Sequence, residues 1–138
     1  MCLRRRFRVN SNTSVAPGAK ELILDLEERC CIRQLSLYVN MDDTTGTNKS
    51  RWIIKIDEDE ILNESICSLY EFYTGYMVET GATRPFQVVT FDNSAKLYRL
   101  IFHDLGRVDR RFAVFFENKD TSNVASVRVG VIYDILED

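Results

Sequence analysis

The chain has 138 residues and a mass of 16.0 kDa, is 45% hydrophobic and 11% aromatic, and contains only 6 Gly and 2 Pro. This length and composition fit one domain with one core over residues 1–138 and exclude disordered and collagen-like chains. The net charge of −3 argues against a protein whose whole surface binds nucleic acid. There is no apolar run of the roughly 20 residues that span a bilayer and no signal peptide, so we expect a cytoplasmic protein without a membrane span.

The first nine residues, 1–9, are expected to form a basic arm or strand. Four basic residues stand here without an acid: Arg4, Arg5, Arg6 and Arg8. Subtracting these four from the 18 basic residues leaves 14 bases against 21 acids in the rest of the chain. Polar and apolar residues alternate from Arg6 to Val9, which favours an exposed first strand. We expect no nucleic-acid partner except through this arm.

Two strands and a long loop follow. Asn10–Gly18 is rich in turn-forming residues, and Lys20–Leu26 then carries leucine at every second position. Cys30–Asn40 alternates apolar with polar residues, which is typical of a half-buried strand. Met41–Ser50 has no apolar period and is expected to be a surface loop.

The period of the apolar residues changes in the middle of the chain. Arg51–Asp57 alternates as a strand does. From Asp59 to Tyr73 the apolar residues are spaced by three and four, which predicts an amphipathic helix of about three turns. A glycine-containing connection, Tyr76–Arg84, leads out of it.

Four more strands are expected in the remaining third of the chain. They are Phe86–Phe91, Lys96–His103, Arg111–Glu117 and Ala125–Leu136, with a charged loop at Asp104–Arg110. The last strand is long and β-branched, so we expect it to be central and buried. About eight strands with one short helix between the fourth and fifth, and no alternating βαβ pattern, predict an all-β protein: an antiparallel, jelly-roll-like β-sandwich. The order of the strands cannot be derived from spacing.

The cysteines and the single histidine do not form a known catalytic or metal-binding pattern. Zinc sites need paired cysteines or several histidines, whereas this chain has no C-x-x-C and only His103. A disulfide between Cys31 and Cys67 is one option, and reduced thiols are favoured in a chain without a signal peptide. The acidic run Asp57–Glu60 lacks the spacing of a calcium loop and fits the first turn of a helix. We therefore predict no enzyme, no metal and no cofactor, with His103 at the end of a strand.

Aromatic side chains are the first group of candidate contact residues. They are Trp52, Tyr70, Tyr73 and Tyr76. Such amphipathic rings are common where proteins bind a glycan or another protein. The alternative is that the tyrosine-rich end of the helix covers the core as a lid.

Arginines are the second group. Arg107, Arg110 and Arg111 alternate with acids, so they form either a self-neutralised loop or half of a subunit contact. Together with Arg4, Arg5 and Arg6 they are the candidate residues for a subunit or an anion contact.

Three stretches of the chain carry a resemblance to a known group of proteins. They are Ser14–Gly18 before the Leu22–Leu26 strand, Trp52–Asp57 leading into Ile61-Leu62, and the closing Val127–Leu136. Over its whole length the pattern resembles the small jelly-roll proteins of virus particles, which include capsid, decoration and spike subunits. Those proteins are similar to tumour-necrosis-factor-like and lectin-like sandwiches, and many assemble as trimers. The resemblance implies assembly or surface attachment without catalysis.

The sequence therefore favours one function and leaves a second as its alternative. The first is a non-catalytic structural or interaction module that forms homo-oligomers, a trimer among them, or binds other structural proteins. If the protein is viral, this implies a place in the virion or the host cytoplasm. The alternative is a carbohydrate- or ligand-binding β-sandwich that uses surface aromatics.

Overall fold

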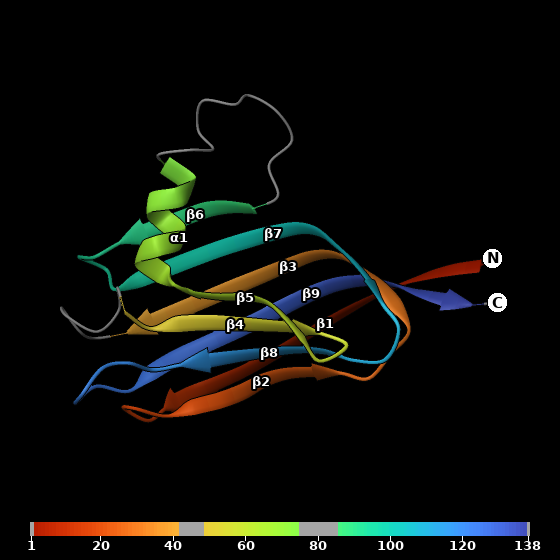
Figure 1. Cartoon of the computed structure of the whole chain (residues 1–138). Coiled ribbons are helices and arrows are strands. Elements are labelled where there is room, and N and C mark those ends of the chain that lie inside the picture. Colours follow the sequence, from red (N-terminus) through yellow and green to blue (C-terminus); the bar gives the residue numbers. More distant parts are fainter. Residues whose placement is uncertain (1, 42–48, 75–85, 138) are drawn as a thin grey trace.

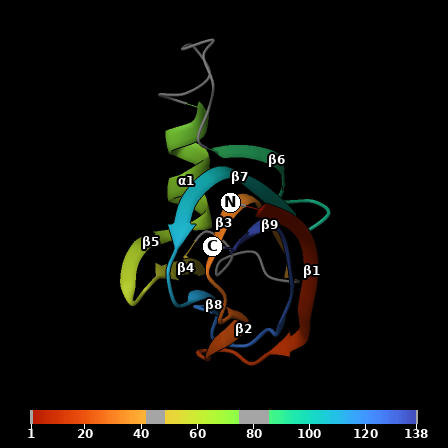
Figure 2. The ribbon, with the colours of Figure 1, turned by 90° about the vertical axis from the view of Figure 1, so that its right-hand side faces the viewer.

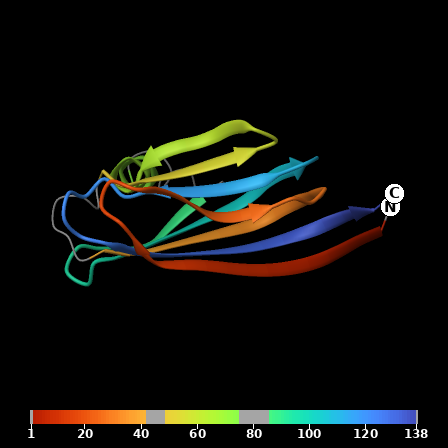
Figure 3. The same cartoon turned by 90° about the horizontal axis from the view of Figure 1, so that it is seen from below.

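The computed structural model describes residues 2–41, 49–74 and 86–137, which form nine strands and one short helix. In chain order they are β1 (Cys2–Val15), β2 (Lys20–Leu26), β3 (Cys30–Met41), β4 (Arg51–Ile56), β5 (Asp59–Ser65), α1 (Ile66–Phe72), β6 (Phe86–Asp92), β7 (Leu97–Val108), β8 (Phe112–Glu117) and β9 (Ala125–Glu137). The strands form two antiparallel sheets, seen as two layers in Figure 3. The predicted all-β antiparallel sandwich is confirmed.

The strands pair from the ends of the chain toward its middle. One sheet has the order β1-β9-β3-β7-β6 and the other the order β2-β8-β4-β5 (Figure 1). Thus β1 pairs with β9, β2 with β8, β3 with β7 and β4 with β5. A long hairpin wound in this way gives the two Greek keys of a jelly roll, to which β6 adds one edge strand.

The core lies between the two sheets. Alternate residues of β3, β7, β8 and β9 point inward and are buried, as period-two patterning requires. Trp52 of β4 meets the edge of Phe116 of β8, with ring centroids 4.9 Å apart. Strand β9 lies between β1 and β3, and its Val129 has no exposed surface. The expectation of a central, buried last strand is confirmed.

The short helix α1 packs against β6 and the end of the core. Its N-cap is Ser65, whose hydroxyl accepts a hydrogen bond from the backbone N–H of Ser68 at 3.1 Å. Its buried residues, Ile66 and Leu69, join the core of the sandwich. The helix follows β5 of the four-stranded sheet and packs on β6, the edge strand of the other sheet.

The predicted helix is wrong in its first half. It was expected over Asp59–Tyr73, but it begins at Ile66, and the residues before it form strand β5. β5 pairs with β4 through a two-residue turn in which Asp57 and Glu58 have φ of 51° and 72°. Positive φ at both positions is the conformation of a type I′ hairpin turn. Leu62 contacts the core from β5, so its three- and four-residue spacing to later apolar residues did not require a helix.

Two expected loops are largely strand. β1 continues through the first part of Asn10–Gly18 to Val15, and β7 continues through the expected charged loop to Val108. A register shift against β3 accompanies positive φ at Asp104 and Gly106, so the strand bends there instead of ending. Residues 42–48 of the expected loop Met41–Ser50, and the whole of the expected connection Tyr76–Arg84, lie outside the described residues.

Within the described ranges, no helix combines the length and the apolar character that a bilayer crossing requires.

Candidate interaction surface

The outer face of the five-stranded sheet exposes apolar side chains on its edge strand β1. Phe7 is 72% exposed and Val9 is 65% exposed. They lie opposite Ile132 and Gly130 of β9, which alternate with core residues and therefore face away from the core. The outward face of a sandwich normally carries polar residues. Large exposed apolar groups in such a place mark a contact surface when they lie together.

The middle of this face is recessed, because Gly130 and Ser36 have no side chain or a small one. A Cβ atom added at Gly130 would lie 3.8 Å from the side chain of Val9 and 3.9 Å from Ser36. Beyond Ser36 a hollow of about 140 Å³ opens between β3, β6 and β7. It is lined by Ser36, Leu37, Tyr38, Val89, Arg99, Leu100 and Ile101. The candidate surface therefore extends from Phe7 and Val9 on β1, which we call the apolar ridge, to the shallow hollow beside β7.

An ion cluster fixes the end of this face nearest the termini. Asp134 of β9 is 4% exposed and accepts two hydrogen bonds from Arg5 of β1, at 2.9 and 3.1 Å. Arg33 of β3 donates a third, at 2.7 Å. The hydrogen bonds from Arg5 and Arg33 lower the pKa of Asp134 to about 2. Asp134 of β9 thus links Arg5 of β1 with Arg33 of β3.

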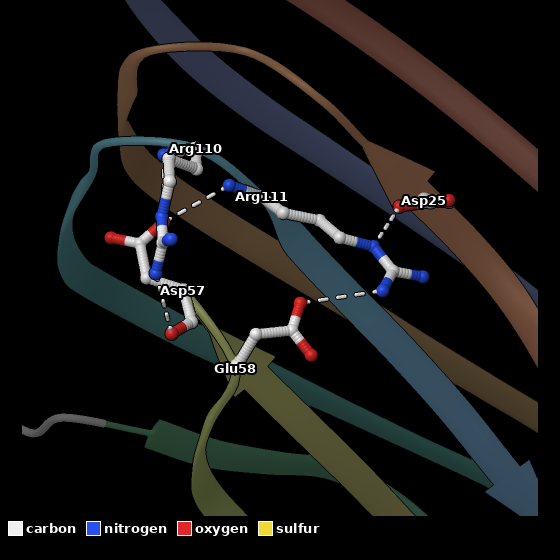
Figure 4. Close-up of polar contacts among 5 residues, drawn as sticks. All are labelled: Asp25, Asp57, Glu58, Arg110 and Arg111. Carbon is white, nitrogen blue, oxygen red and sulfur yellow. Dashed lines mark hydrogen bonds and ion pairs between the residues drawn. The ribbon is translucent and has the colours of Figure 1, made fainter.

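A second polar cluster joins two connections at one end of the sandwich (Figure 4). The carboxylate of Asp57 accepts hydrogen bonds from three successive backbone N–H groups, those of Asp109, Arg110 and Arg111, at 3.0, 2.7 and 3.0 Å. These hydrogen bonds lower the pKa of the Asp57 carboxyl, and the bond from Asp109 has the largest effect. The backbone of the β7–β8 connection thereby holds the β4–β5 turn in place.

The arginines predicted as a subunit or anion contact have partners within the chain. Arg111 donates to Asp25 at 2.7 Å and contacts Glu58 at 3.4 Å, and Arg107 donates to Asp109 at 2.8 Å. These contacts agree with the self-neutralised alternative for this cluster. A subunit contact through Arg107, Arg110 and Arg111 stays a prediction. Of the N-terminal arginines, Arg5 binds Asp134, while Arg4 and Arg6 are exposed on β1.

The three aromatic candidates within the described residues pack against other parts of the chain. Trp52 is completely buried, which corrects its assignment as a ligand contact. Tyr70 stacks on Phe91 with centroids 4.0 Å apart, and Tyr73 packs against the core beside Phe86. These contacts agree with the lid alternative, because rings on a helix close an open end of a sandwich. Tyr76 lies outside the described residues.

The thiols and the histidine do not form an activated pair in the described part of the chain. Cys30, Cys31 and Cys67 are free, and burial raises the pKa of Cys30 to about 12. Burial raises the pKa of the Cys67 thiol, and the neighbouring Glu71 raises it further, so thiolate formation is opposed. His103 lies within β7, opposite Gln34, and not at the end of a strand. Among the described residues, no group of acids, cysteines or histidines is arranged to hold a metal ion.

Sequence reasoning missed Phe7 and Val9 as exposed surface residues and Asp134 as the buried centre of an ion cluster. The alternation Arg6–Val9 indicated a strand, but only the register with β9 shows which face Phe7 occupies. A charged residue inside the strongest strand, Asp134, was the one available signal, because a lone carboxylate in such a strand needs a partner.

The sequence was compared with models of known protein families and with curated proteins, and it matches none of them.

Proposed function

We propose that this protein is a non-catalytic structural module that assembles with copies of itself, as a jelly-roll subunit of a virion-type particle does. The observation that carries the proposal is the exposure of Phe7 and Val9 on the outer face of the five-stranded sheet. Burying such side chains against a partner gains about 1.5–3 kcal/mol for each large apolar residue. The nested jelly-roll strand order supports it, because this architecture is common in capsid proteins.

Two double variants test the proposal. Phe7→Thr with Val9→Thr removes the apolar ridge while keeping residues that favour strands, so we expect weaker self-association. Leu22→Thr with Val124→Thr removes apolar groups that are 42% and 51% exposed elsewhere, and serves as the matched control. Light scattering during size-exclusion chromatography measures the mass of each variant. Equal masses for the wild type and the Phe7/Val9 variant, at every concentration, would argue against this surface.

The hollow favours a second candidate function, the binding of a small carbohydrate. It combines an aliphatic wall at Val89 and Ile101 with the polar groups of Tyr38 and Arg99, and sugars are bound by such mixed surfaces. Arg128 lies over the ring of Tyr38, 5.6 Å from its centroid. A glycan array tests this candidate, and Ile101→Trp, which fills the hollow, should abolish any binding observed.

A further inference from the structure

Strand β1 has a long open edge that the other edge strands of the sandwich lack. It pairs with β9 in unbroken register from Cys2 to Asn12, and in the described residues no strand pairs with its other side. The remaining edge strands, β2, β5 and β6, have seven residues each, and each has a register shift against its neighbour. Short length and bulges prevent edge-to-edge pairing, whereas a long regular edge presents backbone N–H and C=O groups for another strand.

The charges of β1 select one way in which it could pair with itself. Its first half holds Arg4, Arg5, Arg6 and Arg8, and its second half, Asn10–Ser14, is polar and uncharged. If two β1 strands pair antiparallel and the outer faces of both sheets stay on the same side, one residue of β1 must lie directly opposite the same residue of the other copy. We call this residue the centre of the pair. Centres at residues 6, 7 or 8 place arginine opposite arginine, which is destabilising. The first centre that avoids this is Val9.

Centring on Val9 also joins the exposed apolar groups. The two Val9 side chains lie directly opposite, and each Phe7 lies diagonally across from the Val9 of the other copy. Arg4, Arg5 and Arg6 then face Ser14, Thr13 and Asn12. The two Arg8 residues are diagonal neighbours and face Asn10.

We infer that β1 pairs edge to edge with β1 of a second copy, antiparallel and centred on Val9, so that two five-stranded sheets become one continuous sheet (Figure 2 shows β1 at the side of the sandwich). This inference rests on the proposed function, because it names the contact by which the copies assemble. The interface is isologous, with the same strand on both sides of a twofold axis.

A cysteine cross-link tests this register. Directly opposed residues of an antiparallel pair have Cα atoms about 4.5–5.5 Å apart, within the range of a disulfide. In a background with Cys2, Cys31 and Cys67 replaced by serine, Val9→Cys should give a disulfide-linked dimer with oxidised glutathione as the oxidant. Thr13→Cys is the matched control on the same strand. The two Thr13 residues would be separated by eight positions, about 27 Å, so this variant should stay monomeric on a non-reducing gel.

A second variant tests the contact without oxidation. Val9→Arg places two arginines opposite each other and should weaken dimerisation by about tenfold or more, whereas Val124→Arg should leave it unchanged. If the wild type associates but Val9→Cys cross-links no better than Thr13→Cys, the register is wrong while self-assembly stands. If the wild type is monomeric at every concentration, both proposals fail.

Discussion

Asp57 is the residue on which two connections of the sandwich depend. Its side chain satisfies three backbone N–H groups of the β7–β8 connection, while its own backbone forms the β4–β5 turn. Asp57→Ala leaves these donors without their acceptor and places alanine at a positive φ, so we expect the free energy of unfolding to fall by about 1–2 kcal/mol. Urea denaturation measures the change. Glu60→Ala, at an exposed position of β5, is the control, and equal stability of the two variants would refute this role for Asp57.

Asp134 makes the stability of the protein depend on acid. Its folded pKa, about 2, lies below its ordinary value of 3.8, so its ion cluster stabilises the fold fully above pH 4 and loses this contribution as the pH falls toward 2. We expect Asp134→Asn to melt at a lower temperature than the wild type at pH 6. Thermal melts from pH 6 to pH 2 should show this difference shrinking. A difference that stays constant over that interval would contradict the assigned cluster.

The β4–β5 hairpin shows, at the scale of an element, where the sequence was insufficient. Its turn residues, Asp57 and Glu58, are not the Asn-Gly or Asp-Gly pair that normally identifies a type I′ turn. The turn is held instead by the backbone of residues 109–111, which are distant in the sequence. The three- and four-residue spacing of apolar residues from Leu62 onward fitted one helix. In the structure Leu62 lies in strand β5, and the helix α1 begins only at Ile66.

Substitution at Glu58 tests the turn. Glu58→Gly creates Asp-Gly and relieves a φ of 72°, so we expect the free energy of unfolding to rise by about 1 kcal/mol. The same substitution within β5, Glu60→Gly, should lower it by a similar amount, since glycine weakens a strand. Chemical denaturation of both variants gives the two changes. Destabilisation by Glu58→Gly would show that the turn does not have this conformation.

Most of the strands were predictable, because burial of one face imposes alternation on strands such as β3 and β9, whereas β5 is mostly exposed and was missed. Cys30–Asn40, Arg51–Asp57 and Ala125–Leu136 agree with β3, β4 and β9 to within one or two residues. The burial of Trp52 was not predictable. Alternation places Trp52 on one face of β4 but does not say whether that face meets the core or a partner.

At the scale of the whole molecule, the sandwich class followed from the sequence but the strand order did not. β1 and β9 are paired although more than one hundred residues separate them, and no local pattern records that pairing. The same limit applies to the candidate surface. The basic strand was recognised from Arg4, Arg5 and Arg6, but the apolar ridge required knowledge of the face that β1 turns outward.

Sedimentation equilibrium of the unmodified chain, from micromolar to millimolar concentration, tests self-assembly most directly. We expect the weight-average mass to rise above the 16.0 kDa of a single chain toward 32 kDa, twice that mass, or a higher multiple. A mass that stays at 16.0 kDa over the whole range would contradict the proposed function.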